Sequence, residues 1–116
     1  MSEVVIYHNP RCSKSRQTLN LLRDRGIEPR IVEYLKTPPD EQTLSGILQM
    51  LGIRPVDLVR TKEDEFGALG LHEKRDDPRA LIRAMTSHPI LIERPIVING
   101  NRARLGRPPE NVLEIL

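Results

Sequence analysis

Apolar and polar residues along the first third of the chain switch from a strand pattern to a helical pattern and back. Residues Val4 to Tyr7 are apolar and mostly β-branched, which predicts a short strand buried on both faces. From Ser13 to Arg25, leucines recur among polar residues, and the glycine that follows is typical of a helix end. Pro29 to Leu35 is again largely apolar and predicts a second strand. This order predicts a βαβ unit with parallel strands and a right-handed crossover.

The segment from residue 40 to residue 88 follows a helical pattern. From Asp40, apolar residues recur at i, i+3, i+4 and i+7 as far as Leu51, and Gly52 ends the predicted helix. Further helices are expected at Pro55–Val59, at Glu63–Leu69 and after the pair Asp77-Pro78. We expect this region to be wholly helical and to end at His88-Pro89.

Two short strands and a final helix complete the pattern. Pro95–Ile98 and Arg102–Leu105 flank Asn99-Gly100-Asn101, which predicts a β-hairpin. Pro108-Pro109 opens a short final helix. The order βαβ, helical insertion at about residues 40–88, then ββα predicts an α/β thioredoxin-like fold with a mixed four-stranded sheet. We expect residues 1–116 to form a single domain.

Composition narrows the class of protein. The 116 residues can bury one hydrophobic core, and the single cysteine excludes an intramolecular disulfide, which suits a reducing cytoplasm. The sequence contains no stretch near the ~20 apolar residues of a membrane span, and its start lacks the pattern of a signal peptide. We therefore expect a cytoplasmic protein without a membrane partner.

The charge pattern favours a small anion over nucleic acid. Lys and Arg number 18 against 16 Asp and Glu, a net charge of only +2, and only three residues are aromatic. A base-stacking surface is therefore not expected. Fourteen of the basic residues are arginines, whose planar guanidinium matches oxyanions, although a GC-rich genome also raises the number of arginines.

The only cysteine, Cys12, lies between the first strand and the first helix. A helix N-terminus presents unpaired N–H groups and the positive end of the helix dipole, both of which favour a thiolate. Arg11, Lys14 and Arg16 add positive charge nearby. We therefore expect a pKa below the usual ~8.5 and a nucleophilic cysteine, and not a buried structural one.

Three neighbours of the cysteine each have two possible roles. His8 either tunes the thiol, as a base or as an imidazolium, or only bonds to a backbone carbonyl. Ser13 and Ser15 either donate hydroxyl hydrogen bonds to the thiolate or cap the helix.

The spacing around Cys12 excludes two kinds of cysteine loop. A phosphatase loop needs an arginine six residues after the cysteine, where this chain has Thr18. A dithiol oxidoreductase needs a second cysteine three residues on, where this chain has Ser15. A disulfide step must therefore use a thiol from another molecule.

Three arginines stand next to turn or proline signals: Arg60, Arg94 and Arg107. Each is a candidate for anion binding, against the commoner alternative of a solvated surface charge. In thioredoxin-like folds a cis-proline before the third strand faces the active cysteine. If Pro95 is that proline, Arg94 points at Cys12.

Four stretches carry motifs of a known family: Ile6 to Arg16, Tyr34 to Pro39, His88 to Val97 and Leu105 to Pro108. With them the chain resembles the glutaredoxin-coupled arsenate reductase family, over Val4 to Leu116. The resemblance implies that Cys12 is the nucleophile and that His8 tunes it. It implies an oxyanion site made of Arg60, Arg94 and Arg107, supported by Ser15, Arg16 and Pro95. The pair Ser13-Lys14 departs from the Gly-Thr of the plasmid-borne members and leaves room for another substrate.

The resemblance also implies a reaction and its partners. Arsenate is reduced to arsenite through a covalent Cys12–arsenic intermediate, glutathione is the co-substrate, and glutaredoxin completes the reduction. No bound cofactor is expected, and no metal, because Cys12 and His8 are too few soft ligands. Two alternatives remain: a glutathione-linked thiol oxidoreductase acting on another substrate, and an Spx-like regulator that binds RNA polymerase. Ser15 in place of a second cysteine argues against the regulator.

Overall fold

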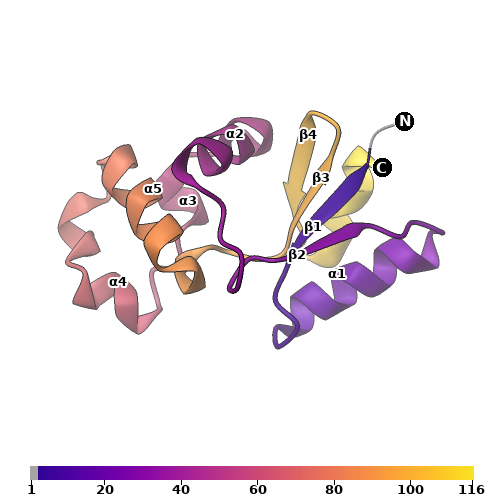
Figure 1. The fold of residues 1–116 in the computed structure, drawn as a ribbon, viewed down its shortest axis with the longest axis horizontal. Coiled ribbons are helices and arrows are strands. Elements are labelled where there is room, and N and C mark those ends of the chain that lie inside the picture. The colour runs from indigo at the N-terminus through magenta and orange to yellow at the C-terminus, as the bar shows by residue number, and fades with distance from the viewer. Residues whose placement is uncertain (1–2) are drawn as a thin grey trace. The chain divides into compact units, whose positions relative to one another are not determined.

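A computed structural model describes residues 3–116, and these residues form two compact units (Figure 1). Unit 1 combines residues 3–37 with Arg94–Leu116, and unit 2 is Pro38–Glu93. Unit 2 is the predicted helical insertion, with boundaries at 38 and 93 instead of about 40 and 88. In the described residues, no helix is both long and apolar enough to cross a membrane. That the whole chain behaves as one domain stays a prediction.

Unit 1 is built on a mixed four-stranded sheet, as the sequence predicts. Its strands are β1 (Val4–His8), β2 (Arg30–Glu33), β3 (Ile96–Asn99) and β4 (Arg102–Leu105), in the order β2-β1-β3-β4. Strand β2 runs parallel to β1, and β3 runs antiparallel to both β1 and β4. The central position of β1 follows from its apolar residues, and it brings the end of β1 next to the start of β3.

Two helical segments pack against the sheet and against each other: α1 (Ser13–Asp24) and the 3₁₀ helix η3 (Pro109–Ile115). They bury a core made of Ile6, Leu19, Leu22, Val97, Val112 and Ile115. Each buried aliphatic side chain of this kind contributes roughly 1.5–3 kcal/mol to folding. The predicted final helix is thus present, as a 3₁₀ helix. This packing fixes the position of the α1 N-terminus, where Cys12 lies.

Strand β2 and the hairpin differ in detail from the prediction. Strand β2 ends at Glu33, because the N–H groups of the residues at 36 and 37 turn back to the Glu33 carbonyl, at 2.9 and 3.0 Å. Leu35, predicted in the strand, is 38% exposed, and Ile31 in the edge strand is 39% exposed. The hairpin loop has two residues, Gly100-Asn101, because Asn99 pairs with Arg102.

Unit 2 is a cluster of short helices. They are α2 (Glu41–Leu51), α3 (Pro55–Leu58), α4 (Asp64–Ala68), η1 (Leu71–Lys74), α5 (Pro78–Ser87) and η2 (Pro89–Leu91). Asp40 and Asp77 cap α2 and α5 by accepting hydrogen bonds from the N–H groups of Thr43 and Ala80. The expectation of a wholly helical region that ends at His88-Pro89 was wrong. Val59 pairs with Ile92 in an isolated antiparallel bridge, and the unit continues to Glu93.

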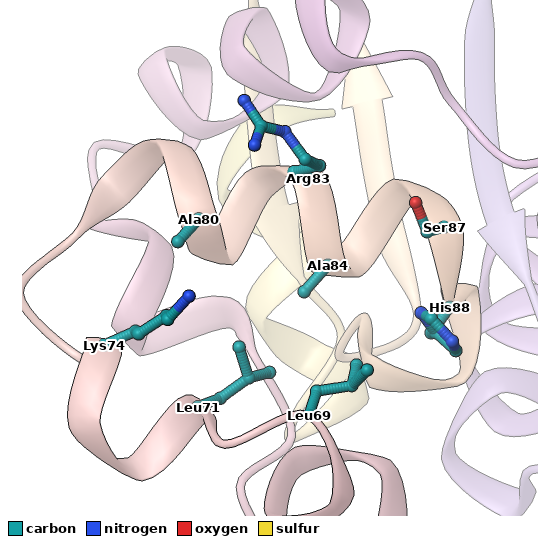
Figure 2. A pocket seen from close by; sticks show the side chains of 8 residues that line it. All are labelled: Leu69, Leu71, Lys74, Ala80, Arg83, Ala84, Ser87 and His88. Atoms are coloured by element: carbon teal, nitrogen blue, oxygen red, sulfur yellow. The ribbon is translucent and has the colours of Figure 1, made fainter.

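A cavity of about 230 Å³ lies between η1 and α5 within unit 2. Figure 2 shows the aliphatic side chains of Leu69 and Leu71 opposite Ala80 and Ala84 of α5, with Lys74 at one end and His88 at the other. The middle of the cavity is thus apolar.

Candidate active site

Cys12 is the N-cap residue of α1, at the start of the helix as the sequence predicts. Its φ is −90° and its ψ is 123°. Its N–H donates to the carbonyl of Asn9 at 3.0 Å, and its carbonyl accepts the N–H of Arg16 at 3.0 Å. The Arg16 side chain holds the same loop from outside, because its Nη1 donates to the carbonyl of Pro10 at 2.9 Å. The loop therefore presents a partly exposed thiol at the start of the helix.

The surroundings of Cys12 favour the thiolate. Burial raises the pKa of the Cys12 thiol, but hydrogen bonds from the backbone N–H groups of Ser15 and Lys14 and from the Arg94 side chain lower it more, and the Arg94 charge adds to this. The resulting pKa lies below that of an ordinary thiol. The predicted direction is confirmed, but its strongest side-chain cause is Arg94, which is distant in sequence, and not Arg11 or Arg16.

Arg94 and Arg107 converge on the cysteine. Arg107 Nη1 lies 3.8 Å from the Cys12 Sγ and donates to the carbonyl of Arg94 at 3.0 Å. Arg94 is 9% exposed, and the Arg94-Pro95 peptide bond is cis, as predicted. The Arg107-Pro108 bond is also cis, which the sequence did not indicate. Unit 1 thus places two guanidinium groups beside one thiol.

Gly106, the residue before Arg107, makes a close backbone contact. The N–H of Gly106 donates to the carbonyl of Pro95 at 2.9 Å, and the Thr18 hydroxyl approaches the Gly106 carbonyl at 3.4 Å. A Cβ atom at Gly106 would lie 2.5 Å from Thr18 Oγ1 and 2.7 Å from Pro95 Cγ, so only glycine fits. Sequence reasoning did not assign roles to Gly106 and Thr18. The signal was a glycine directly before an Arg-Pro pair.

His8 reaches the cysteine through Ser15. The Ser15 hydroxyl lies 2.6 Å from His8 Nδ1 and accepts the N–H of Asn9 at 3.0 Å, while the Ser15 N–H lowers the Cys12 pKa. Neither role expected for the hydroxyl of Ser15 is observed, since it bonds to His8. Helix α1 has no side-chain cap, so Ser13 does not cap it either.

The ring of His8 is buried, and its ionisation follows from that. Burial is the main cause that lowers the pKa of His8, Arg23 and Arg16 lower it further, and Glu33 partly opposes them. The neutral imidazole is therefore the stable form near pH 7. Of the two forms considered for His8, the geometry favours the neutral ring over the imidazolium.

Arg60 lies in unit 2 and has a different environment. Its Nε donates to Glu63 at 3.1 Å and its Nη1 to Glu93 at 2.9 Å, and all three residues belong to unit 2. The structure therefore brings Arg94 and Arg107 together with Cys12 within unit 1, whereas the part of Arg60 in an anion site stays a prediction. Among residues 3–116, no cluster of three or more His, Cys, Asp and Glu side chains could hold a metal ion.

Comparisons with known proteins show which proteins this chain resembles. The model of the ArsC family matches residues 7–115 of the chain. The chain is 53% identical over 115 residues to YfgD of Escherichia coli (strain K12), an uncharacterized protein, covering 98% of this chain and 97% of YfgD. It is 49% identical over 114 residues to an arsenate reductase of Haemophilus influenzae, covering 97% and 98% of the two chains.

A solved structure shows the same fold. The arsenate reductase from Vibrio cholerae superposes with a TM-score of 0.94 at 50% sequence identity, over 99% of this chain and 98% of that one. The fold expected from the order of elements is therefore confirmed.

Proposed function

This chain belongs to the ArsC family, and on that premise we propose that it reduces arsenate to arsenite with glutathione and glutaredoxin as electron donors. The observation that carries the proposal is the convergence of Arg94 and Arg107 on Cys12, a thiol whose pKa is lowered. Relatives named arsenate reductase, 49 and 50% identical over nearly the whole chain, support the choice of substrate.

The arginines offset the repulsion between arsenate and the Cys12 thiolate. Arsenate carries one to two negative charges near neutral pH and would be repelled by a thiolate. Guanidinium groups bind such an oxyanion by paired hydrogen bonds and offset its charge. Arg94 and Arg107 bind arsenate next to the Cys12 sulfur, and the part of Arg60, which the resemblance implies, stays a prediction. Fixing the anion beside the nucleophile also removes much of the entropic cost of the attack.

The first step is a nucleophilic substitution at arsenic. The Cys12 thiolate forms an As–S bond, and one arsenate oxygen takes up protons and leaves as water, so that arsenic remains As(V). Glutathione then displaces a second oxygen, also as water, and forms a second As–S bond. Its thiol is needed because the chain has a single cysteine.

The second stage transfers the electrons. A glutaredoxin thiolate attacks the glutathione sulfur, an S–S bond forms, and the electron pair of the breaking As–S bond stays on arsenic, which becomes As(III). Water then displaces Cys12 and releases arsenite. Glutathione is therefore a co-substrate, the chain itself needs no bound cofactor, and the glutathione requirement suits a reducing cytoplasm.

His8 and Ser15 position the nucleophile in this scheme. Ser15 is fully buried and bonds to His8 through its hydroxyl, while its own N–H donates to the thiolate. A neutral His8 holds Ser15 in place without adding a charge. The pair therefore acts on the pKa of Cys12 through the geometry of the loop.

The test is arsenate-dependent consumption of NADPH in the presence of glutathione, glutaredoxin and glutathione reductase. We expect turnover with the wild type and none above background with Cys12→Ser, which removes the nucleophile at nearly constant size. Absence of arsenate-dependent turnover in the wild type would overturn the proposed substrate. Turnover that survives in Cys12→Ser would overturn the covalent mechanism.

A further inference from the structure

A groove in unit 1 runs along the cysteine loop and is lined by residues 8–11 of that loop together with Glu33, Leu35 and Lys36. Its volume of about 310 Å³ lies at the small end of the range of roughly 300–1,000 Å³ for small-molecule sites. We propose that this groove binds glutathione, the thiol co-substrate. The inference rests on the proposed function and adds to it the place where the second thiol is held.

The lining of the groove carries two opposite charges next to each other. Lys36 Nζ and Glu33 Oε1 are 3.7 Å apart, and both side chains are exposed, so their mutual attraction is weak. The γ-glutamyl end of glutathione carries an ammonium and a carboxylate on one carbon atom. The ammonium can bind Glu33 while the carboxylate binds Lys36, which replaces one weak pair with two.

The cysteine loop supplies a cation for the second carboxylate. Arg11 lines the groove, is exposed, and directly precedes Cys12. It is placed to bind the carboxylate of the glycine residue. Two cations and one anion then face two carboxylates and one ammonium. The thiol of glutathione lies between its two carboxylates, and this orientation holds it against the loop that carries Cys12.

The remaining contacts fit a peptide. Asn9 is only 4% exposed and lines the groove, and its Oδ1 accepts the N–H of Arg11 at 3.0 Å. Among the hydrogen bonds of residues 3–116, the Asn9 side chain takes part only through this oxygen, so its amide NH₂ can donate to a peptide carbonyl. Leu35, 38% exposed, offers an apolar wall for the methylene groups.

The first experiment measures binding without chemistry. S-methylglutathione cannot form a disulfide or an As–S bond, and its affinity is measured by isothermal titration calorimetry. We expect Lys36→Ala and Arg11→Ala each to weaken binding at least tenfold. Lys74→Ala removes the same charge from the cavity of unit 2 (Figure 2) and is expected to leave the affinity unchanged. S-methyl-γ-glutamylcysteine, which lacks the glycine residue, should bind wild type and Arg11→Ala equally.

The second experiment measures turnover at varied glutathione. We expect Lys36→Ala and Arg11→Ala to raise the KM for glutathione at least tenfold and to leave the KM for arsenate unchanged. Equal affinities and KM values in wild type and groove variants would overturn the glutathione site, as would an equal loss in Lys74→Ala. If the proposed function fails, no arsenate-dependent turnover occurs, while S-methylglutathione binding still tests the groove by itself.

Discussion

Unit 1 and unit 2 each fix an arginine, and they do so with different partners. In unit 1, Arg107 donates to the backbone carbonyl of Arg94 and approaches the Cys12 sulfur. In unit 2, Arg60 donates to the carboxylates of Glu63 and Glu93. A carbonyl holds a guanidinium without cancelling its charge, whereas two carboxylates offset it.

The comparison concerns the groups that orient each arginine. Arg107 is oriented by the backbone carbonyl of Arg94, and its guanidinium lies near the Cys12 thiol, whose pKa is lowered. Arg60 is oriented by two carboxylates, which offset its charge. The two units therefore differ in the kind of group that orients these arginines. Four predictions test this difference, beginning with the strongest effect.

The largest effect is expected from the arginines themselves. Arg94→Ala and Arg107→Ala should each lower kcat/KM for arsenate about 10²–10³-fold, the usual loss for a donor that stabilises transition-state charge. Arg60→Ala should cost only about tenfold, because its charge is already offset by Glu63 and Glu93.

Steady-state kinetics at saturating glutathione and glutaredoxin measures these losses. The matched control is Arg102→Ala, which removes an exposed arginine of β4 in unit 1 that donates to the carbonyl of Glu114. It should leave kcat/KM unchanged. Equal losses for the variants at positions 60, 94 and 107 would show that the partners of an arginine do not predict the effect of its loss.

The second effect concerns stability. Gly106→Ala should lower the free energy of unfolding by about 1–3 kcal/mol, because the new methyl group meets Thr18 and Pro95. Gly46→Ala is the control in unit 2, because a Cβ atom there meets nothing within 4 Å. Inside α2, alanine should be more stable than glycine by about 0.5–1 kcal/mol. Urea unfolding followed by circular dichroism measures both. Equal changes in the two variants would contradict the tight contact in unit 1.

The third effect is on the thiol. The rate of alkylation by iodoacetamide should reach half its maximum below pH ~8.5, the usual thiol pKa. Arg94→Ala should move this midpoint upward, because the hydrogen bond and the charge of Arg94 both lower the pKa of Cys12. Lys62→Ala, which removes an exposed cation from unit 2, should not move it. An unchanged midpoint in Arg94→Ala would show that the helix N–H groups alone stabilise the thiolate.

The smallest effect is on the pH dependence of folding. Burial lowers the pKa of His8 in the folded state, so below the unfolded value of ~6.5 the unfolded chain binds the proton more readily. The stability from a neutral His8 is therefore complete above that pH and is lost as the pH falls toward the folded pKa. His8→Gln should weaken this pH dependence. A His8 proton resonance that titrates at or above ~6.5 in the native protein would refute the burial effect.

Patterns within one element were enough to predict much of the molecule. The N-terminal position of Cys12 on α1, the start of α5 at Asp77-Pro78 and the hairpin before Arg102 depend on neighbours a few residues away. The thiol's lowered pKa was also foreseen, because helix N–H groups act on a cysteine at that position wherever the helix lies. The position of Arg94 near Cys12 could be predicted only from the expected cis-proline and from the family motif.

Contacts across the chain could not be predicted in the same way. Cys12 and Arg107 are separated by 95 residues, and Thr18 and Gly106 by 88. The sheet order β2-β1-β3-β4 brings these pairs together, and no periodicity records which side chain then fills the space. The bond from Ser15 to His8 was missed because a serine in the first turn usually serves as a cap or faces water.

The elements, a nucleophilic Cys12 and the need for an external thiol could all be predicted from the sequence, because these predictions depend on local pattern and on the presence of one cysteine. Which charges act on that cysteine depends on the tertiary structure. Packing of β3 and β4 beside β1 places Arg94 and Arg107 at the Cys12 sulfur, while Arg60 is held by carboxylates of its own unit. Since electrostatic interactions depend on distance and burial, only the folded chain distinguishes an arginine that lies at the thiol from one that is held by carboxylates.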